Sequence, residues 1–129
     1  MVIDTSALLA ILQNEPERRA FNEAIERTPK RLLSAATLLE ASTVMEARYG
    51  PAGIADLDAF LERADIEILP FDSRQAYEAR RAFSRFGKGR HPAKLNLGDC
   101  FSYALARVRN EKLLFKGTDF SQTDLESAI

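Results

Sequence analysis

The sequence of 129 residues contains one cysteine, one histidine and no long apolar segment. With a single cysteine, Cys100, the chain cannot form an internal disulfide. One cysteine and one histidine are also too few ligands for a typical zinc site. No apolar run approaches the ~20 residues of a membrane-spanning helix, and the first residues lack the basic and then apolar layout of a signal peptide. We therefore expect a cytoplasmic protein that does not contact a membrane.

The chain also lacks internal repeats, low-complexity segments and a large excess of one charge. It has 18 basic and 19 acidic residues, a formal net charge of −1, and a globular balance of 46% hydrophobic and 29% charged residues. This length is typical of one domain, so we expect a single domain over residues 1–129. The net charge argues neither for nor against a nucleic-acid partner.

One segment departs from this even balance of charges. Between Ala79 and Gly98 there is no acidic residue. The basic residues of the segment are Arg80, Arg81, Arg85, Lys88, Arg90 and Lys94, and the only histidine, His91, lies among them. A local positive field of this kind suits a polyanion such as RNA. A solvated helix face that leads into a loop is the alternative explanation.

Strand patterns alternate with helix patterns along the chain. Short apolar runs predict strands at 1–3, 31–35, 66–71 and 112–116, with a possible edge strand at 124–129. Periodic apolar residues predict helices at 6–14, 17–28, 36–49, 52–65, 73–86 and 97–110. This alternation predicts the α/β class, with a mainly parallel central sheet and helices on both faces.

Helix caps and one apolar stripe sharpen these boundaries. Asn14, before Pro16, is predicted to cap the second helix, and Asp72 with Gln75 is predicted to form a capping box at the fifth. The fifth helix is expected to bury the stripe Ala76, Ala79, Phe83 and Phe86.

Three acids stand where a site is expected in an α/β domain. Asp4 follows the first strand and Asp119 follows the last, and sites in open α/β sheets form beyond the carboxyl ends of the strands. Asp99 lies in the first turn of its helix, next to Gly98, which permits another group to approach closely. Structural roles explain each acid singly: a helix cap at Asp4, a turn at Asp119, and a cap with Asn96 at Asp99.

Glu40 has the weakest structural explanation of the acids. It lies in mid-helix in LLEASTV, with Ala36, Val44 and Ala47 at helical spacing, on a face that we expect to pack in the core. No basic residue lies four positions to either side. A buried carboxylate needs a partner, a proton or a metal. Four such acids repel one another where they meet, and a hard cation such as Mg²⁺ or Mn²⁺ removes that repulsion.

The sequence resembles a known family in four segments. MVIDTSALLAIL, LLEASTV, GKGRHPAKLNLGDCFSYALA and LLFKGTDFSQTDL occur in the order expected of PIN-domain ribonucleases. The resemblance is to the VapC toxins of type II toxin–antitoxin systems, and it covers the whole chain. It implies a PIN fold and a Mg²⁺- or Mn²⁺-dependent endoribonuclease that cuts structured cellular RNA, such as tRNA or a ribosomal RNA loop. It also implies arrest of translation, a homodimer, and a cognate VapB antitoxin that occupies the cleft.

The resemblance assigns roles by motif. Asp4 and Asp99 match the acids closest to the metal, Glu40 and Asp119 match the other two acids, and Asp124 resembles a second downstream acid of some members. Supporting hydroxyls are expected at Thr5, Ser6 and Thr118. We expect RNA contacts from Lys88, Arg90, His91 and Lys94. Cys100 is expected to be a small buried residue, and Phe83, Phe86, Phe101 and Tyr103 are expected in the core.

Two other classes of protein remain alternatives. A phosphatase of the haloacid dehalogenase type would need an aspartate two positions after Asp4, where Ser6 stands, and a receiver domain would need an acidic pair near the start. A non-enzymatic module that binds RNA or an antitoxin would not need the four acids. The apolar faces of residues 17–28 and 52–65 are candidate dimer or antitoxin surfaces, and core packing explains them equally well.

Overall fold

The central sheet has four short strands, all parallel, in the order β3-β2-β1-β4. The structure, a computed structural model, describes residues 1–129. The strands are β1 (Val2–Ile3), β2 (Leu32–Ser34), β3 (Glu67–Leu69) and β4 (Leu113–Leu114). Val2 lies opposite Leu32 on one side and opposite Leu113 on the other. All four predicted strands are present, each shorter than its apolar run.

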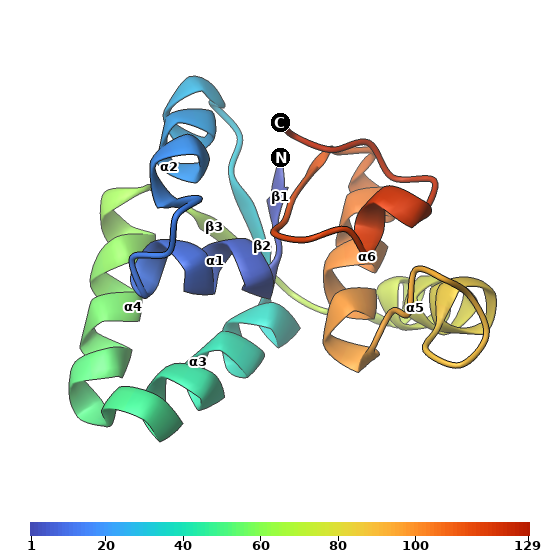
Figure 1. The fold of residues 1–129 in the computed structure, drawn as a ribbon, viewed down its shortest axis with the longest axis horizontal. Coiled ribbons are helices and arrows are strands. Elements are labelled where there is room, and N and C mark those ends of the chain that lie inside the picture. Colours follow the sequence, from blue (N-terminus) through green and yellow to red (C-terminus); the bar gives the residue numbers. More distant parts are fainter.

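Six helices and one short 3₁₀ turn surround the sheet. They are α1 (Thr5–Leu12), α2 (Arg18–Arg27), α3 (Ala35–Tyr49), α4 (Pro51–Arg63), α5 (Ser73–Phe86), α6 (Leu97–Arg109) and η1 (Phe120–Gln122). Figure 1 shows α1 to α4 on one side of the strands and α5 with α6 on the other. None of these helices combines the length and the apolar character needed to span a membrane.

Two hydrophobic cores lie on the two faces of the sheet. Side chains of a strand alternate between faces, so Ile3, Leu33 and Leu114 join the core formed with α1, α2 and α4. Their neighbours Val2, Leu32 and Leu113 join the core formed with α5 and α6. Burial on both faces explains why β1 and β4 contain only apolar residues, whereas the edge strand β3 exposes Glu67 and Ile68. The predicted α/β architecture is confirmed.

The predicted cap at Asn14 is wrong. Helix α2 begins at Arg18, and Asn14 has a left-handed backbone with φ 54° at the end of α1. There the N–H of Glu15 donates to the carbonyl of Ala10 at 2.9 Å, the pattern of a left-handed helix stop. Asparagine favours both positions, and here it ends one helix instead of starting the next.

The capping box predicted at the start of α5 is only half formed. The Asp72 carboxylate accepts from the N–H of Gln75 at 2.9 Å, but the Gln75 amide donates to the carbonyl of Pro70, so the box does not close. The buried stripe also differs, because α5 buries Gln75, Ala79, Ala82 and Phe86. Ala76 and Phe83 are exposed, which corrects the expected core position of Phe83.

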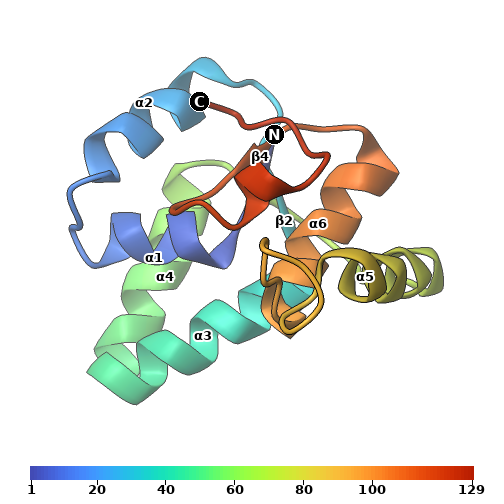
Figure 2. The ribbon, with the colours of Figure 1, turned by 45° about the vertical axis from the view of Figure 1, so that its right-hand side comes forward.

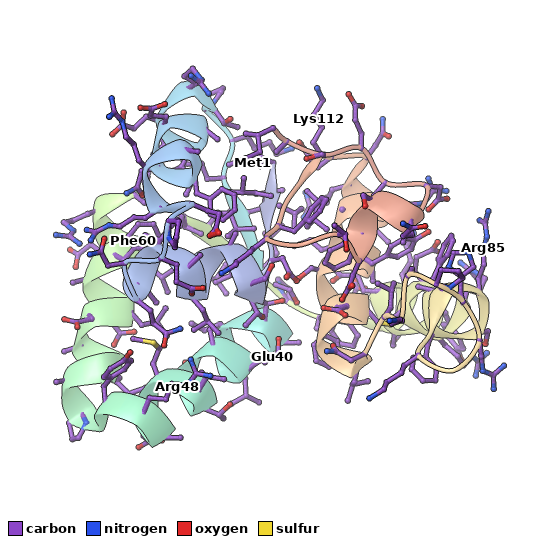
Figure 3. All side chains as sticks on the ribbon, in the orientation of Figure 1. Met1, Glu40, Arg48, Phe60, Arg85 and Lys112 are labelled. Atoms are coloured by element: carbon purple, nitrogen blue, oxygen red, sulfur yellow. The ribbon has the colours of Figure 1, made fainter.

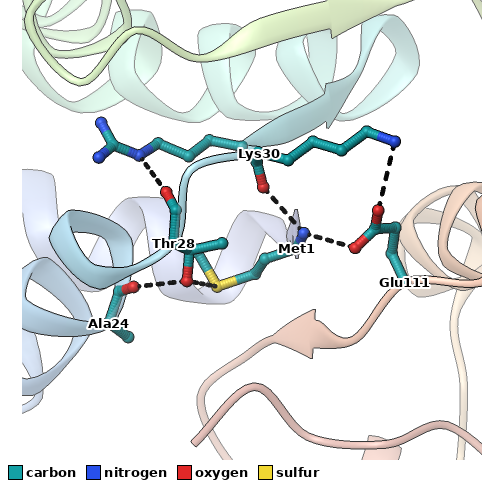
Figure 4. A network of polar contacts seen from close by, with 6 residues as sticks. Met1, Ala24, Thr28, Lys30 and Glu111 are labelled. Carbon is teal, nitrogen blue, oxygen red and sulfur yellow. Dashed lines mark hydrogen bonds and ion pairs between the residues drawn. The ribbon is translucent and has the colours of Figure 1, made fainter.

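The C-terminal tail adds one isolated bridge beside β4, between Ser127 and Leu113. At the same end of the sheet, the Met1 amine donates to the carbonyl of Lys30 at 2.9 Å and to Glu111 Oε2 at 2.8 Å (Figure 4). Lys30 Nζ lies 3.4 Å from the other Glu111 oxygen. These residues precede β1, β2 and β4, so the network ties together the amino ends of three strands.

Candidate active site

The four candidate acids reach one edge of the sheet from four elements. Asp4 follows β1 and caps α1, Asp119 follows β4, Glu40 lies in α3, which starts directly after β2, and Asp99 lies in the first turn of α6. Figure 1 shows the starts of α1, α3 and α6 close together below the strands. This edge holds the carboxyl ends of parallel strands, as predicted for Asp4 and Asp119.

Asp4 is the most buried acid, at 2% exposure. Its Oδ2 accepts from the Ser6 N–H at 3.0 Å and from the Ser6 hydroxyl at 2.6 Å, and its Oδ1 accepts from the Ser102 hydroxyl at 2.6 Å. Burial raises the pKa of Asp4, and these hydrogen bonds, the Ser102 bond first, act in the opposite direction. Asp4 is both the predicted helix cap and a member of the acid group.

Glu40 lies on the flank of α3 that meets α6. The core-facing residues of α3 are Thr37, Ala41 and Met45, so the expectation that Glu40 interrupts the core face is wrong. Because alanines stand on several sides of this helix, its apolar periodicity is weak and the face was misjudged. The Glu40 carboxylate accepts a hydrogen bond from the Thr5 hydroxyl.

Gly98 makes room for the Glu40 carboxylate. A Cβ atom added at Gly98 would lie 1.9 Å from Glu40 Oε2, so any side chain there would displace the carboxylate. The close approach predicted at Gly98 is therefore made by a side chain from α3, across the first turn of α6.

Asp99 closes a capping box with Asn96. Its N–H donates to Asn96 Oδ1 at 2.9 Å, and its Oδ2 accepts from the Asn96 N–H at 3.0 Å. The pKa of Asp99 is raised from 3.8 to about 7: burial is the main cause, the charges of Asp4, Asp119 and Glu40 add to it, and the Asn96 hydrogen bond acts in the opposite direction. The four carboxylates thus lie near enough to repel one another at Asp99.

Asp119 is exposed and begins η1, two residues after Gly117, whose φ is 93°. Its carboxylate makes no hydrogen bond or ion pair within the protein. Of the three supporting hydroxyls, Thr5 donates to Glu40 and Ser6 donates to Asp4, and Ser6 Oγ also accepts from the Lys116 N–H at 2.9 Å. The exposed Thr118 offers its carbonyl to the Ser121 hydroxyl.

The chemistry of this group of acids fits a hard divalent cation. None of the four acids pairs with a lysine or arginine, and oxygen ligands without counter-charge are those that Mg²⁺ and Mn²⁺ prefer. The carboxylates of Asp4, Glu40 and Asp99 accept hydrogen bonds within the protein, and no three of the four acids converge at ligating distance. The donor set therefore fits the ion, while the carboxylates are not arranged around a common point.

Residues 87–96, which we call the basic loop, connect the end of α5 to the start of α6. Ala93 and Leu95 are fully buried, and Leu95 pairs with Gly87, so the loop is anchored at both ends. Its cations, Lys88, Arg90 and Lys94, are exposed and make no ion pair. His91 holds the loop together, because its Nδ1 accepts from the Ala93 N–H at 3.0 Å and its ring meets Phe86 edge-on.

Other predicted residues lie away from the acids. Asp124 accepts from the Tyr103 hydroxyl at 2.7 Å and faces Arg85 at 3.5 Å and Arg107 at 3.8 Å. Phe86, Cys100 and Tyr103 are buried as expected, and Phe101 is half-buried. The sequence reasoning missed Ser102 as a partner of Asp4. Its place three residues after Asp99, on the same side of α6, was the available signal.

Comparison with known proteins shows similarity over nearly the whole chain. Residues 1–126 match the family model of the PIN domain. The chain is 50% identical over 125 residues to ribonuclease VapC30 of Mycobacterium tuberculosis (strain ATCC 25618 / H37Rv), covering 97% of this chain and 95% of that protein.

Solved structures share the fold. The crystal structure of Mycobacterium tuberculosis VapC20, described as a Sarcin-Ricin loop cleaving toxin, gives a TM-score of 0.77 at 16% identity, covering 96% and 95% of the two chains. VapBC2 from Rickettsia felis, bound to a DNA fragment from its promoter, gives 0.74 at 16% identity, with 98% and 94% covered.

Proposed function

Because this chain belongs to the PIN-domain family, among the VapC ribonucleases, we propose that it is a toxin whose Mg²⁺-dependent cleavage of RNA arrests translation. Mn²⁺ substitutes for Mg²⁺ in this proposal, because both ions take oxygen ligands. The substrate is structured cellular RNA, either a tRNA or a ribosomal RNA loop. VapC20, which shares the fold, is described as cleaving such a loop.

One observation carries the proposal most directly: four acids lie at one edge of the sheet without a counter-charge, and the charges of the other three contribute to the raised pKa of Asp99. A purely structural group of acids would be expected to pair with cations, as the Asp124 carboxylate does with Arg85 and Arg107. The arrangement is therefore best explained by a cation that neutralises the site.

In this proposal the four acids bind the metal ion. Asp4 and Asp99 would hold the ion, and Glu40 and Asp119 would complete the set. When bound, such an ion offsets charge that develops on the phosphate and lowers the pKa of water. The Ser6 and Ser102 hydroxyls fix the Asp4 carboxylate, and the Thr5 hydroxyl fixes that of Glu40.

RNA binding in this proposal uses the basic loop. Lys88, Arg90 and Lys94 bind phosphates, which sets affinity and position and does not read the base sequence. His91 is placed with them as an RNA contact, through its Nε2 edge, because its Nδ1 is already engaged by Ala93.

We further propose that a cognate VapB antitoxin neutralises the toxin, that the toxin forms a homodimer, and that it acts in the cytoplasm. The antitoxin is supported by the VapC relatives and by the fold shared with a VapBC assembly.

The test is RNA cleavage by the purified protein with Mg²⁺ or Mn²⁺, and with EDTA. Asp99→Asn should lower the rate at least ~100-fold, since it removes one charge that holds the ion. Asp58→Asn is the matched control, because Asp58 is an exposed aspartate on α4, away from the site. Cleavage that persists in EDTA, or an active Asp99→Asn protein, would refute the metal site. Binding of RNA or antitoxin without any cleavage would favour the non-enzymatic module.

A further inference from the structure

The exposed side of α5 alternates cations and aromatic rings. Arg74, Tyr77, Arg80 and Phe83 follow one another at a spacing of three residues, so they form a slanted row on the helix surface. We call these four residues the α5 row. All four are exposed, with Tyr77 at 55% and Phe83 at 40%, while the opposite side of α5 packs on α6.

The row is not neutralised by neighbouring acids. Arg74 and Arg80 make no ion pair, and the only acid in residues 73–94, Glu78, pairs with Arg81. The Arg80 guanidinium lies over the Tyr77 ring, 4.9 Å from its centroid. The cation therefore covers one face of the Tyr77 ring, and more than half of the tyrosine remains open to solvent.

The row leads to the basic loop, which connects α5 to the helix that carries Asp99. The ring of Phe83 lies 3.1 Å from the point where a Cβ of Gly87 would be, so the row ends where the basic loop begins. Figure 2 shows α5 running from the outer edge of the molecule to this loop, which continues into α6. Figure 3 shows Arg85, on the last turn of α5, on one side of the molecule and Glu40 near its centre. The loop thus connects the α5 row to the helix that carries Asp99.

We propose that the α5 row binds a single-stranded segment of the RNA substrate, beside the bond that is cut. The arginines bind phosphates, and Tyr77 and Phe83 stack against bases, the combination by which proteins bind single strands. This inference rests on the proposed ribonuclease function and extends its RNA-binding surface from the loop to α5.

A second copy of the chain fits this surface less well. Residues 73–94 contain seven cations and one acid, and a two-fold contact would bring this surface against itself. Like charges brought together in this way oppose association. A polyanion has the complementary charge.

Fluorescence anisotropy in EDTA, over a series of salt concentrations, tests the inference. The probe is a fluorescein-labelled single-stranded RNA of about 20 nucleotides, compared with an abasic strand of equal length that keeps the phosphates. Tyr77→Ala should weaken binding of the normal strand at least ~5-fold, with an unchanged salt slope and unchanged binding of the abasic strand. Arg80→Gln should weaken binding of both strands and reduce the salt slope by about 0.7.

Matched controls are Tyr49→Ala, an exposed tyrosine on α3, and Arg27→Gln, an exposed and unpaired arginine on α2. Row variants that bind like these controls would overturn the inference. So would a change of mass in sedimentation equilibrium with RNA binding unchanged, which would assign the row to a contact between copies. Cleavage of the same RNA with Mg²⁺ separates the two proposals. If row variants bind normally and the wild-type protein cuts, only the inference falls; if the wild-type protein neither binds nor cuts, both fall.

Discussion

The two ends of the sheet treat carboxylates in opposite ways. At the amino ends, Glu111 meets the Met1 amine and Lys30, and the hydrogen bond from the amine is the main cause that holds the pKa of Glu111 below its usual value of 4.5. At the carboxyl ends, Asp99 is surrounded by other acids, and burial raises its pKa to about 7.

This difference separates an acid that stabilises the fold, Glu111, from Asp99, for which we propose a function. The charge of Glu111 is matched in the folded protein, so it favours folding. Burial and the neighbouring acids disfavour the negative charge of Asp99, and a bound cation would stabilise that charge. Proteins commonly give up some stability in this way at functional sites.

The largest effect on the cleavage rate is expected at Gly98. A substitution there disturbs the group of acids at the carboxyl ends of the strands without removing any of them. Gly98→Ala should displace the flexible end of Glu40, and a displacement of about 1 Å can lower a catalytic rate ~100-fold. Stability should change by less than about 1 kcal/mol, since alanine suits a helix. Cleavage rates and thermal melts measure both. In a Glu40→Ala background the added methyl group should have no further effect on the rate, and a persistent loss would show that Gly98 acts otherwise.

The second effect is the pH dependence of stability, which has opposite signs for Asp99 and Glu111. The folded pKa of Asp99 lies above its ordinary value of 3.8, so folded protein binds the proton more tightly. Its contribution to stability is therefore complete below pH 4 and is lost as the pH rises to about 7. In EDTA the melting temperature should fall over this range relative to Asp99→Asn, and Mg²⁺ should restore it. Parallel curves for the two proteins would contradict the assignment.

Ser102→Ala tests the support of Asp4. It leaves the buried Oδ1 without its donor, which should cost about 1–3 kcal/mol of stability. Denaturant unfolding measures the loss. The matched control is Ser42→Ala on α3, where the hydroxyl only bonds back to the Leu38 carbonyl at 2.7 Å. An equal loss of stability in both variants would mean that the hydrogen bond to Asp4 contributes no more than an ordinary bond between a serine and the helix backbone.

The sequence predicted what depends on order along the chain. Asp4 and Asp119 were placed at the site because they follow strands, and Glu40 because it had no partner nearby. The face of α3 and the buried stripe of α5 were not predicted correctly, because alanines gave several equivalent helix faces. The contact of Ser102 with Asp4 depends on how α6 packs against β1, across 98 residues, and the spacing of Ser102 from Asp99 does not by itself determine it.

The smallest effect is expected at the amino end, with Glu111→Gln. The folded pKa of Glu111 is lowered, so its contribution is present above pH 4.5 and is lost as the pH falls through the folded pKa. At pH 7 the variant should lose about 1 kcal/mol, a shift of roughly 3–5 °C in the melting temperature, and this deficit should shrink as the pH falls below 4.5. Its RNA cleavage should be unchanged, because the acids of the site lie at the other end of the strands. Differential scanning calorimetry across this pH range gives the comparison, and Lys112→Gln, which removes the exposed pair with Glu126 near the same strand, is the control. If the stability lost in Glu111→Gln increased toward acid pH, the lowered pKa assigned to Glu111 would be wrong.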